Sequence, residues 1–163
     1  MITSTGLQNL LAVMTMMAET ERLIADFYRT CANLWEEDRE FWLSIVAEEE
    51  KHAGNLDRMA RIVAARPERF EIGRPFNQAA IRTVTAGIES QLKHLKADRV
   101  ARERLLYMAR DMEASVMEKF YGEIVRTSDV EYLTLLKEIT QETIDHKCGI
   151  EERIQALKKE GTP

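Results

Sequence analysis

A glutamate and a histidine occur where an amphipathic helix should be apolar. Glu49 and His52 belong to the segment FWLSIVAEEEKH at residues 41–52, and their spacing places both side chains on one helix face. The same face carries Trp42, Ile45, Val46, Ala53, Leu56, Ala60 and Val63. A carboxylate and an imidazole inside a helical bundle need a compensating group, and a metal ion is the best-known one.

Other segments also place ionisable side chains on their apolar faces, when each residue is advanced by about 100° around a helix axis. The full set of candidate metal ligands is Glu21, Glu49, His52, Glu113, Glu142 and His146. Burying four carboxylates near the middle of a bundle is costly unless cations or protons compensate them. Two divalent metal ions would neutralise four carboxylates and accept two neutral imidazoles, as in dinuclear carboxylate bundles.

The elements that position these residues are expected to be helices. Apolar residues make up 45% of the chain, with seven Gly and three Pro, which favours long helices; polar–apolar alternation never persists, so strands are not expected. We predict four long helices and one shorter one, at about 5–34, 36–66, 99–126 and 131–159, with the shorter at 77–96. Capping boxes starting at Thr5 and Ser128 should begin the first and last helices, and Pro67 should end the second.

The connections between these helices indicate the topology. Short turns join the first long helix to the second and the third to the fourth, so each pair should form an antiparallel hairpin. The hairpins span about 5–66 and 99–159, and a crossover at 67–97 with its own helix separates them. We therefore predict one all-α domain over residues 1–163.

The two hairpins also resemble each other in sequence. A shift of 93 residues aligns Phe27-Tyr28 with Phe120-Tyr121, and it aligns Glu49 with Glu142. A duplicated hairpin would give a bundle with approximate twofold symmetry, in which matching ligands come from facing helices.

Charge and cysteine content exclude several classes of function. The formal net charge is −5 without a basic patch, so nucleic acid and anionic membranes are not expected partners. Cys31 and Cys148 form no C-x-x-C pair, which argues against a zinc ribbon, a rubredoxin-type iron site and a disulfide framework. No signal peptide or membrane-spanning run is evident, so we expect a cytoplasmic protein.

Three segments carry a family resemblance: ERLIADFY at 21–28, EEEKH at 48–52, and Glu113 followed by Phe120-Tyr121. They are similar to the rubrerythrin branch of the ferritin-like superfamily. The resemblance covers the four long helices and implies a ferritin-like four-helix bundle of two antiparallel hairpins. It implies a centre of two iron ions, with manganese or zinc as alternatives, that reacts with peroxide or oxygen.

The resemblance also has implications for individual residues and partners. Glu21 and Glu113 match the ligands from the first and third helices, and Glu49 with His52 matches the pair from the second. Rubrerythrins proper carry a rubredoxin domain, which this chain lacks, so a separate electron-donor protein is implied. A homodimer is implied as well, because related bundles pair along their helices.

The fourth long helix departs from the family pattern. A Glu-x-x-His motif ending at His146 would need a carboxylate at position 143, which is Thr143, and one starting at Glu142 would end at the outward-facing Asp145. Glu142 and His146, four residues apart, are the remaining pair. Two hypotheses follow: a di-iron oxidase or peroxidase, and a degenerate bundle with an incomplete metal site that serves as a structural or interaction module.

Overall fold

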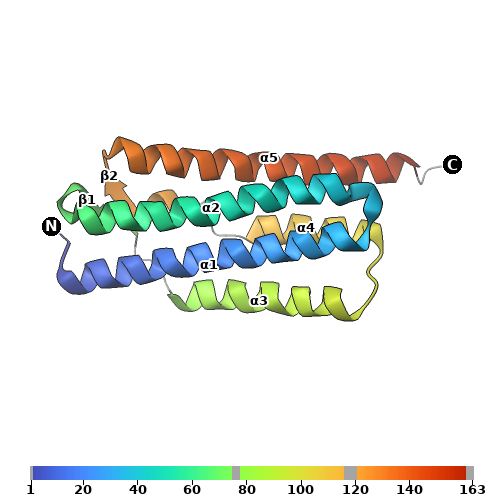
Figure 1. Ribbon diagram of the computed structural model, residues 1–163, viewed down its shortest axis with the longest axis horizontal. Coiled ribbons are helices and arrows are strands. Elements are labelled where there is room, and N and C mark those ends of the chain that lie inside the picture. The colour runs from blue at the N-terminus through green and yellow to red at the C-terminus, as the bar shows by residue number, and fades with distance from the viewer. Residues whose placement is uncertain (1, 75–77, 116–120, 161–163) are drawn as a thin grey trace.

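The computed structural model describes residues 2–74, 78–115 and 121–160 (Figure 1). These residues form five α-helices: α1 (Ser4–Leu34), α2 (Arg39–Ala65), α3 (Gln78–Ala97), α4 (Arg102–Ser115) and α5 (Val130–Glu160). They also form single turns of 3₁₀ helix, among them Glu36–Asp38 and Pro67–Arg69, and two short strands, β1 (Phe70–Ile72) and β2 (Val125–Thr127). The molecule is predominantly helical, as the all-α prediction requires.

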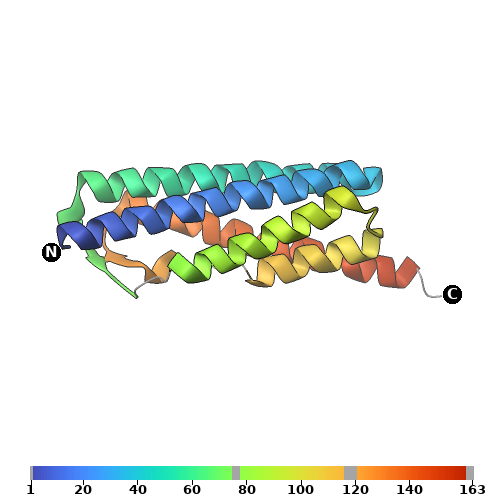
Figure 2. The same cartoon turned by 90° about the horizontal axis from the view of Figure 1, so that it is seen from below.

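The helices lie side by side along the long axis of the molecule. α1 packs along α2, to which the turn Glu36–Asp38 connects it, and α5 packs against both α2 and α4 (Figure 1). α3, which belongs to the expected crossover, lies obliquely beside α1 (Figure 2). Each long helix therefore has at least one helical neighbour along its apolar face.

The third long helix is shorter than the sequence predicts. The prediction extended to residue 126, but α4 is described as Arg102–Ser115 and residues 125–127 form β2, which pairs antiparallel with β1. Phe70 lies opposite Thr127 in this ladder, and the Phe70 and Val125 side chains are buried. The expectation of no strands is therefore wrong, because two non-adjacent segments satisfy each other's backbone hydrogen bonds at the end of the bundle.

Glycine permits the close approach at the end of this ladder. A Cβ atom at Gly73 would lie 2.1 Å from the carbonyl oxygen of Glu123, so any side chain there would force the two segments apart. Residues 116–120 of the predicted third long helix lie outside the described residues, as does the expected helix start at residue 77.

Two helix caps differ from the predicted ones. The Thr3 hydroxyl accepts a hydrogen bond from the Gly6 amide at 3.1 Å and caps α1, whereas Thr5 is already helical. The Asp129 carboxylate accepts from the Tyr132 amide at 3.2 Å and caps α5, in place of Ser128. In both cases the residue directly before the first helical position is the one that reaches the unpaired amides.

The apolar core forms two clusters with a polar layer between them. One cluster lies toward the turn between α1 and α2 and includes Phe27, Trp42 and Leu106; the other lies toward the strands and includes Met17 and Phe70. The buried polar residues between the clusters include all the inward-facing acidic and histidine residues described below.

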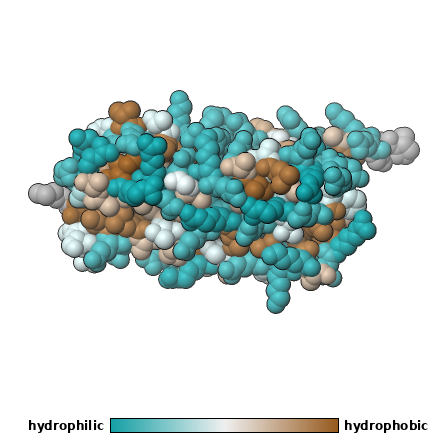
Figure 3. Space-filling view, viewed as in Figure 1, coloured by the Kyte–Doolittle hydropathy of each residue, from teal (hydrophilic) through white to brown (hydrophobic). Residues whose placement is uncertain are grey.

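The face of the molecule drawn in Figure 3 is mostly hydrophilic. On the face shown in Figure 3, apolar side chains gather in small separate areas rather than in one continuous patch. In the described part of the chain, no helix combines the length and apolar character needed to cross a membrane.

Candidate metal centre

Five of the six sequence-predicted ligands lie together in the buried polar layer. They come from four helices: Glu21 from α1, Glu49 and His52 from α2, Glu113 from α4, and His146 from α5. None of these residues is more than 3% exposed. Each belongs to a regular helix, so the packing of the helices fixes where its side chain points.

The five residues form two groups that share one glutamate. Ligand atoms of Glu21, Glu49 and His52 all lie within 4.8 Å of one another, and so do those of Glu49, Glu113 and His146. Nδ1 of His52 is 3.3 Å from Oε2 of Glu49, while Nδ1 of His146 is 3.1 Å from Oε1. The two oxygens of Glu49 therefore face different histidines, so each group of ligand atoms could hold a metal ion with Glu49 shared between them.

The sixth predicted ligand, Glu142, lies outside both groups. Its Oε2 is 2.9 Å from Nε2 of His52, the ring nitrogen that faces away from Glu49. Glu48 occupies the corresponding position on the other side, hydrogen-bonded to Nε2 of His146. Each histidine thus has a carboxylate from the opposite helix behind it, and this carboxylate fixes which nitrogen faces the centre.

The sequence shift that relates α2 to α5 explains why the role of Glu48 behind His146 was not predicted. A shift of 94 residues, one more than the predicted 93, aligns Glu48 with Glu142 and His52 with His146. The same shift aligns Glu49 with Thr143, which is buried and whose hydroxyl donates to the Ile139 carbonyl at 2.8 Å. The centre therefore has three inward carboxylates rather than four, and α5 supplies none of them.

Two buried tyrosines, neither of them among the six predicted ligands, contact the carboxylates of the centre. The Tyr28 hydroxyl donates to Oε1 of Glu113, and the Tyr121 hydroxyl donates to Oε1 of Glu21. These tyrosines are partners in the internal repeat, and each holds a carboxylate from the other half of the chain. The matched Phe-Tyr pairs are the signal that could have revealed this pattern.

Charges within the centre already compensate one another. Burial opposes ionisation of Glu49, but its contacts with His146 and His52 hold its pKa at about 2. Burial likewise opposes protonation of His146, yet Glu49, Glu113 and Glu48 raise its pKa to about 9. In the metal-free protein at neutral pH, Glu49 is therefore a carboxylate and His146 an imidazolium. Burial, together with the charges of Glu113 and Glu49, also raises the pKa of Tyr28 well above its usual value, so its hydroxyl keeps its proton.

The donor set fits a pair of metal ions. Both oxygens of Glu49 and Nδ1 of His146 are buried, and among the described residues none has a hydrogen-bond partner of good geometry. Carboxylate oxygens combined with imidazole nitrogens are ligands that iron and manganese accept, and zinc also binds such sets. A cation between these atoms would replace the weak contacts that the metal-free arrangement leaves.

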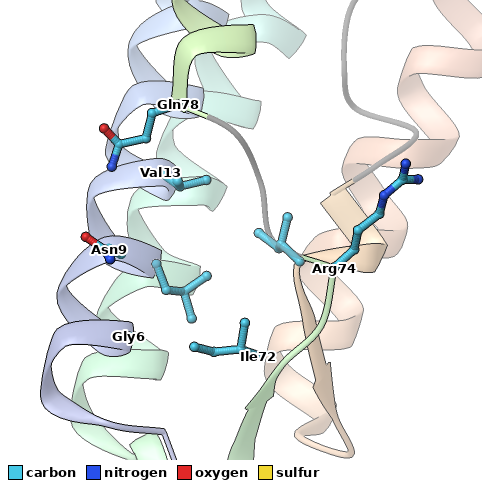
Figure 4. Close-up of a pocket in the computed structure, with 8 residues that line it drawn as sticks. Gly6, Asn9, Val13, Ile72, Arg74 and Gln78 are labelled. Carbon is cyan, nitrogen blue, oxygen red and sulfur yellow. The ribbon is translucent and has the colours of Figure 1, made fainter.

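A hollow elsewhere on the molecule contains none of these groups. It encloses about 300 Å³ between the start of α1 and the segment after β1, and its walls include Leu10, Val13 and Ile72. Figure 4 shows the Arg74 side chain extending away from these apolar residues, and it pairs with Glu123 at 3.3 Å. This hollow is therefore separate from the candidate metal centre.

Compared with known proteins, this chain matches no protein-family model, no curated protein and no solved structure.

Proposed function

We propose that this chain is a ferritin-like, rubrerythrin-like protein that holds two metal ions, normally iron, at a site that reacts with peroxide or oxygen. The observation that carries the proposal is Glu49, whose two oxygens face two histidines and which belongs to both groups of ligand atoms. A single buried glutamate between two such groups is expected for a dinuclear centre and has no equivalent in an ordinary apolar core.

The side chains divide the work between two positions. Glu21 and His52 would hold one ion, Glu113 and His146 would hold the other, and Glu49 would bridge them. Bound iron would supply one-electron redox chemistry and open coordination positions for a small oxidant. Tyr28 and Tyr121 orient the terminal carboxylates through their hydroxyls, and the buried setting excludes bulk water.

Metal binding requires a change in protonation. His146 must lose the proton on Nδ1 before that nitrogen can donate an electron pair, while Nε2 keeps its proton in the contact with Glu48. The electrons for this reaction would come from a separate donor protein.

Anaerobic titration with ferrous iron tests the proposal directly. The purified protein should bind about two equivalents per chain, as expected for a two-metal carboxylate bundle, and air or peroxide should then produce a charge-transfer absorption band. Glu49→Ala should abolish both effects because both positions lose a ligand. Glu50→Ala is the matched control: Glu50 is exposed and pairs with Arg29, so it should bind like the unaltered protein. Binding of less than one equivalent, unchanged by Glu49→Ala, would refute the proposal.

A degenerate bundle without redox turnover is the second candidate, and Thr143 is the observation that favours it. The position that should supply the fourth carboxylate has none, and the Glu49–His146 pair is already neutralised without metal. Chelation distinguishes the two candidates. If the centre holds metal ions, the unfolding free energy of the protein should fall by several kcal/mol when a strong chelator removes them. If the bundle is degenerate, the unfolding curve should be the same with and without chelator.

A further inference from the structure

A continuous row of aromatic rings leads away from the metal centre. The Tyr28 ring, whose hydroxyl donates to Glu113, is stacked on Trp42 with 5.5 Å between ring centroids and 13° between planes. Trp42 in turn contacts Phe41, with centroids 4.9 Å apart. Conjugated rings at such short separations couple electronically far better than saturated side chains do.

The two ends of this row differ in exposure. Tyr28 and Trp42 are fully buried, whereas Phe41 is partly exposed and lines a surface hollow of about 470 Å³ together with Glu36, Glu37 and Glu40. The row therefore connects the buried carboxylate Glu113 with solvent near the start of α2.

We propose that Phe41, Trp42 and Tyr28 form an electron route between the protein surface and the metal centre, with Tyr28 as its redox-active residue. The use of the route in turnover rests on the proposed function: electrons from the external donor enter at Phe41 and reach the centre through Tyr28. The route itself is a property of the folded chain and can be tested without metal.

The chemistry at Tyr28 balances within the site. When Tyr28 loses one electron to an oxidant, its hydroxyl proton moves along the existing hydrogen bond to Oε1 of Glu113. The products are a neutral tyrosyl radical and a protonated Glu113, and one electron from the donor together with the return of that proton restores the phenol.

Trp42 differs from Tyr28 in what it can do with a proton. Its indole Nε1 is buried and, within the described residues, has no hydrogen-bond partner. Oxidised Trp42 therefore cannot release its proton and stays a charged radical in an apolar environment, which is unfavourable. Trp42 is therefore only a transient relay. The stable radical forms on Tyr28, because Glu113 can accept the proton of its hydroxyl.

A cysteine in the chain gives a place to inject an oxidant. Cys148 is exposed and Cys31 is buried, so a thiol-reactive ruthenium polypyridyl complex should label Cys148 selectively. The next residue, Gly149, lies against Phe41: a Cβ there would be 3.1 Å from Cε2 of the Phe41 ring. The label would therefore be attached beside the outer end of the route.

The experiment is flash photolysis of the labelled, metal-free protein with a soluble oxidative quencher. The Ru(III) complex formed by the flash should take one electron from the protein, and the optical and electron paramagnetic resonance signals of a neutral tyrosyl radical should follow. Tyr28→Phe should abolish that radical. Trp42→Phe, which keeps a ring in the core, should slow its formation by an order of magnitude. Tyr132→Phe is the matched control, because it removes a buried tyrosine hydroxyl beside Phe70, outside the row of rings, and should leave the signal unchanged.

Two results would overturn the route. A radical of equal yield in Tyr28→Phe would place the oxidised residue elsewhere, and an unchanged rate in Trp42→Phe would show that Trp42 does not carry the electron. Circular dichroism of each variant establishes that it is folded. Because no metal is present, absence of a tyrosyl radical in the unaltered labelled protein refutes the route alone, while failure to bind iron in a separate titration refutes the proposed function alone.

Discussion

Oε2 of Glu142 lies 2.9 Å from Nε2 of His52, on the opposite side of the ring from the nitrogen that faces Glu49. Glu142 thus stands behind a candidate ligand and orients it, as carboxylates behind metal-binding histidines commonly do. Glu48 has the same relation to His146. The two helices hold each other's histidines, so the spacing between α2 and α5 sets the geometry of the centre.

Glu142→Ala should weaken metal binding without removing a binding position. Loss of a carboxylate behind a histidine typically lowers metal affinity about 10–100-fold, and competition with a chelating dye would measure this change with Mn²⁺ or Fe²⁺. Glu138→Ala is the control, because Glu138 also pairs with Lys51, at 2.6 Å, but contacts neither candidate ligand histidine. A drop in stoichiometry by one ion, at unchanged affinity for the other, would instead make Glu142 a ligand.

Thr143→Glu should restore the carboxylate that the internal repeat lacks on α5. In the metal-free protein an extra buried carboxylate should destabilise the fold by a few kcal/mol. In the metal-loaded protein the same side chain should tighten the second ion, so the difference in stability between loaded and metal-free protein should increase. Urea unfolding with and without Mn²⁺ measures both effects. Thr134→Glu, at an exposed position of α5, is the control and should change neither the stability of the metal-free protein nor the gain in stability on metal binding. If Thr143→Glu destabilises the protein equally with and without metal, position 143 does not face the ions.

Stability and metal affinity should respond to pH in opposite directions. The pKa of His146 is raised to about 9 in the folded, metal-free protein because nearby carboxylates outweigh its burial, whereas an unfolded histidine titrates near 6.5. This contribution to stability is fully present below about pH 6.5 and is lost as the pH rises through about 9. Metal ions compete with the same proton, so their apparent affinity should rise over that interval.

Unfolding curves and metal titrations between pH 6 and about 9.5 would test this opposition. His146→Gln should remove most of the pH dependence of both quantities. His94→Gln should preserve it, because His94 is exposed and pairs with Asp98 at 3.3 Å, far along the chain from the centre. Affinity that falls as the pH rises would contradict the assignment of His146 as a ligand.

Asp38 should be among the most sensitive positions outside the centre. Its buried carboxylate accepts two hydrogen bonds from Arg102, at 2.6 and 2.9 Å, and one from Arg153 at 2.9 Å, so it joins the start of α2 to α4 and α5. Asp38→Ala should cost roughly 3 kcal/mol, the low end for a broken buried pair, because both guanidinium groups can still reach water. Glu37→Ala, at the neighbouring exposed residue, should stay within about 0.5 kcal/mol in the same urea unfolding assay.

The sequence predicted the features that depend on one helix at a time. The apolar faces placed Glu21, Glu49 and Glu113 inside, and the boundaries of α1, α3 and α5 agree closely with the prediction, because a regular 3.6-residue period specifies both. The inward direction of a side chain follows from its own helix, whatever that helix packs against.

Features that depend on two distant segments were predicted poorly. Whether Glu142 binds a metal or supports His52 depends on the axial offset between α2 and α5, and a repeat shift of 93 instead of 94 residues reverses the answer. The β1–β2 pairing is likewise invisible in either strand alone, since each is three residues long. Such short segments become strands only because a partner satisfies their backbone groups.

The small sheet has a consequence for how the chain folds. β1 follows α2 and β2 precedes α5, so their hydrogen bonds bring the end of α2 beside the beginning of α5 while α3 and α4 form an excursion between them. Pairing of the two strands closes this long loop and carries the entropy cost of closure. After that, α5 can dock on α2 as if a short loop joined them. The α2–α5 pair therefore has two connections, one covalent through the excursion and one through hydrogen bonds. We expect a protein nicked between α3 and α4 to retain the contact between His52 and Glu142.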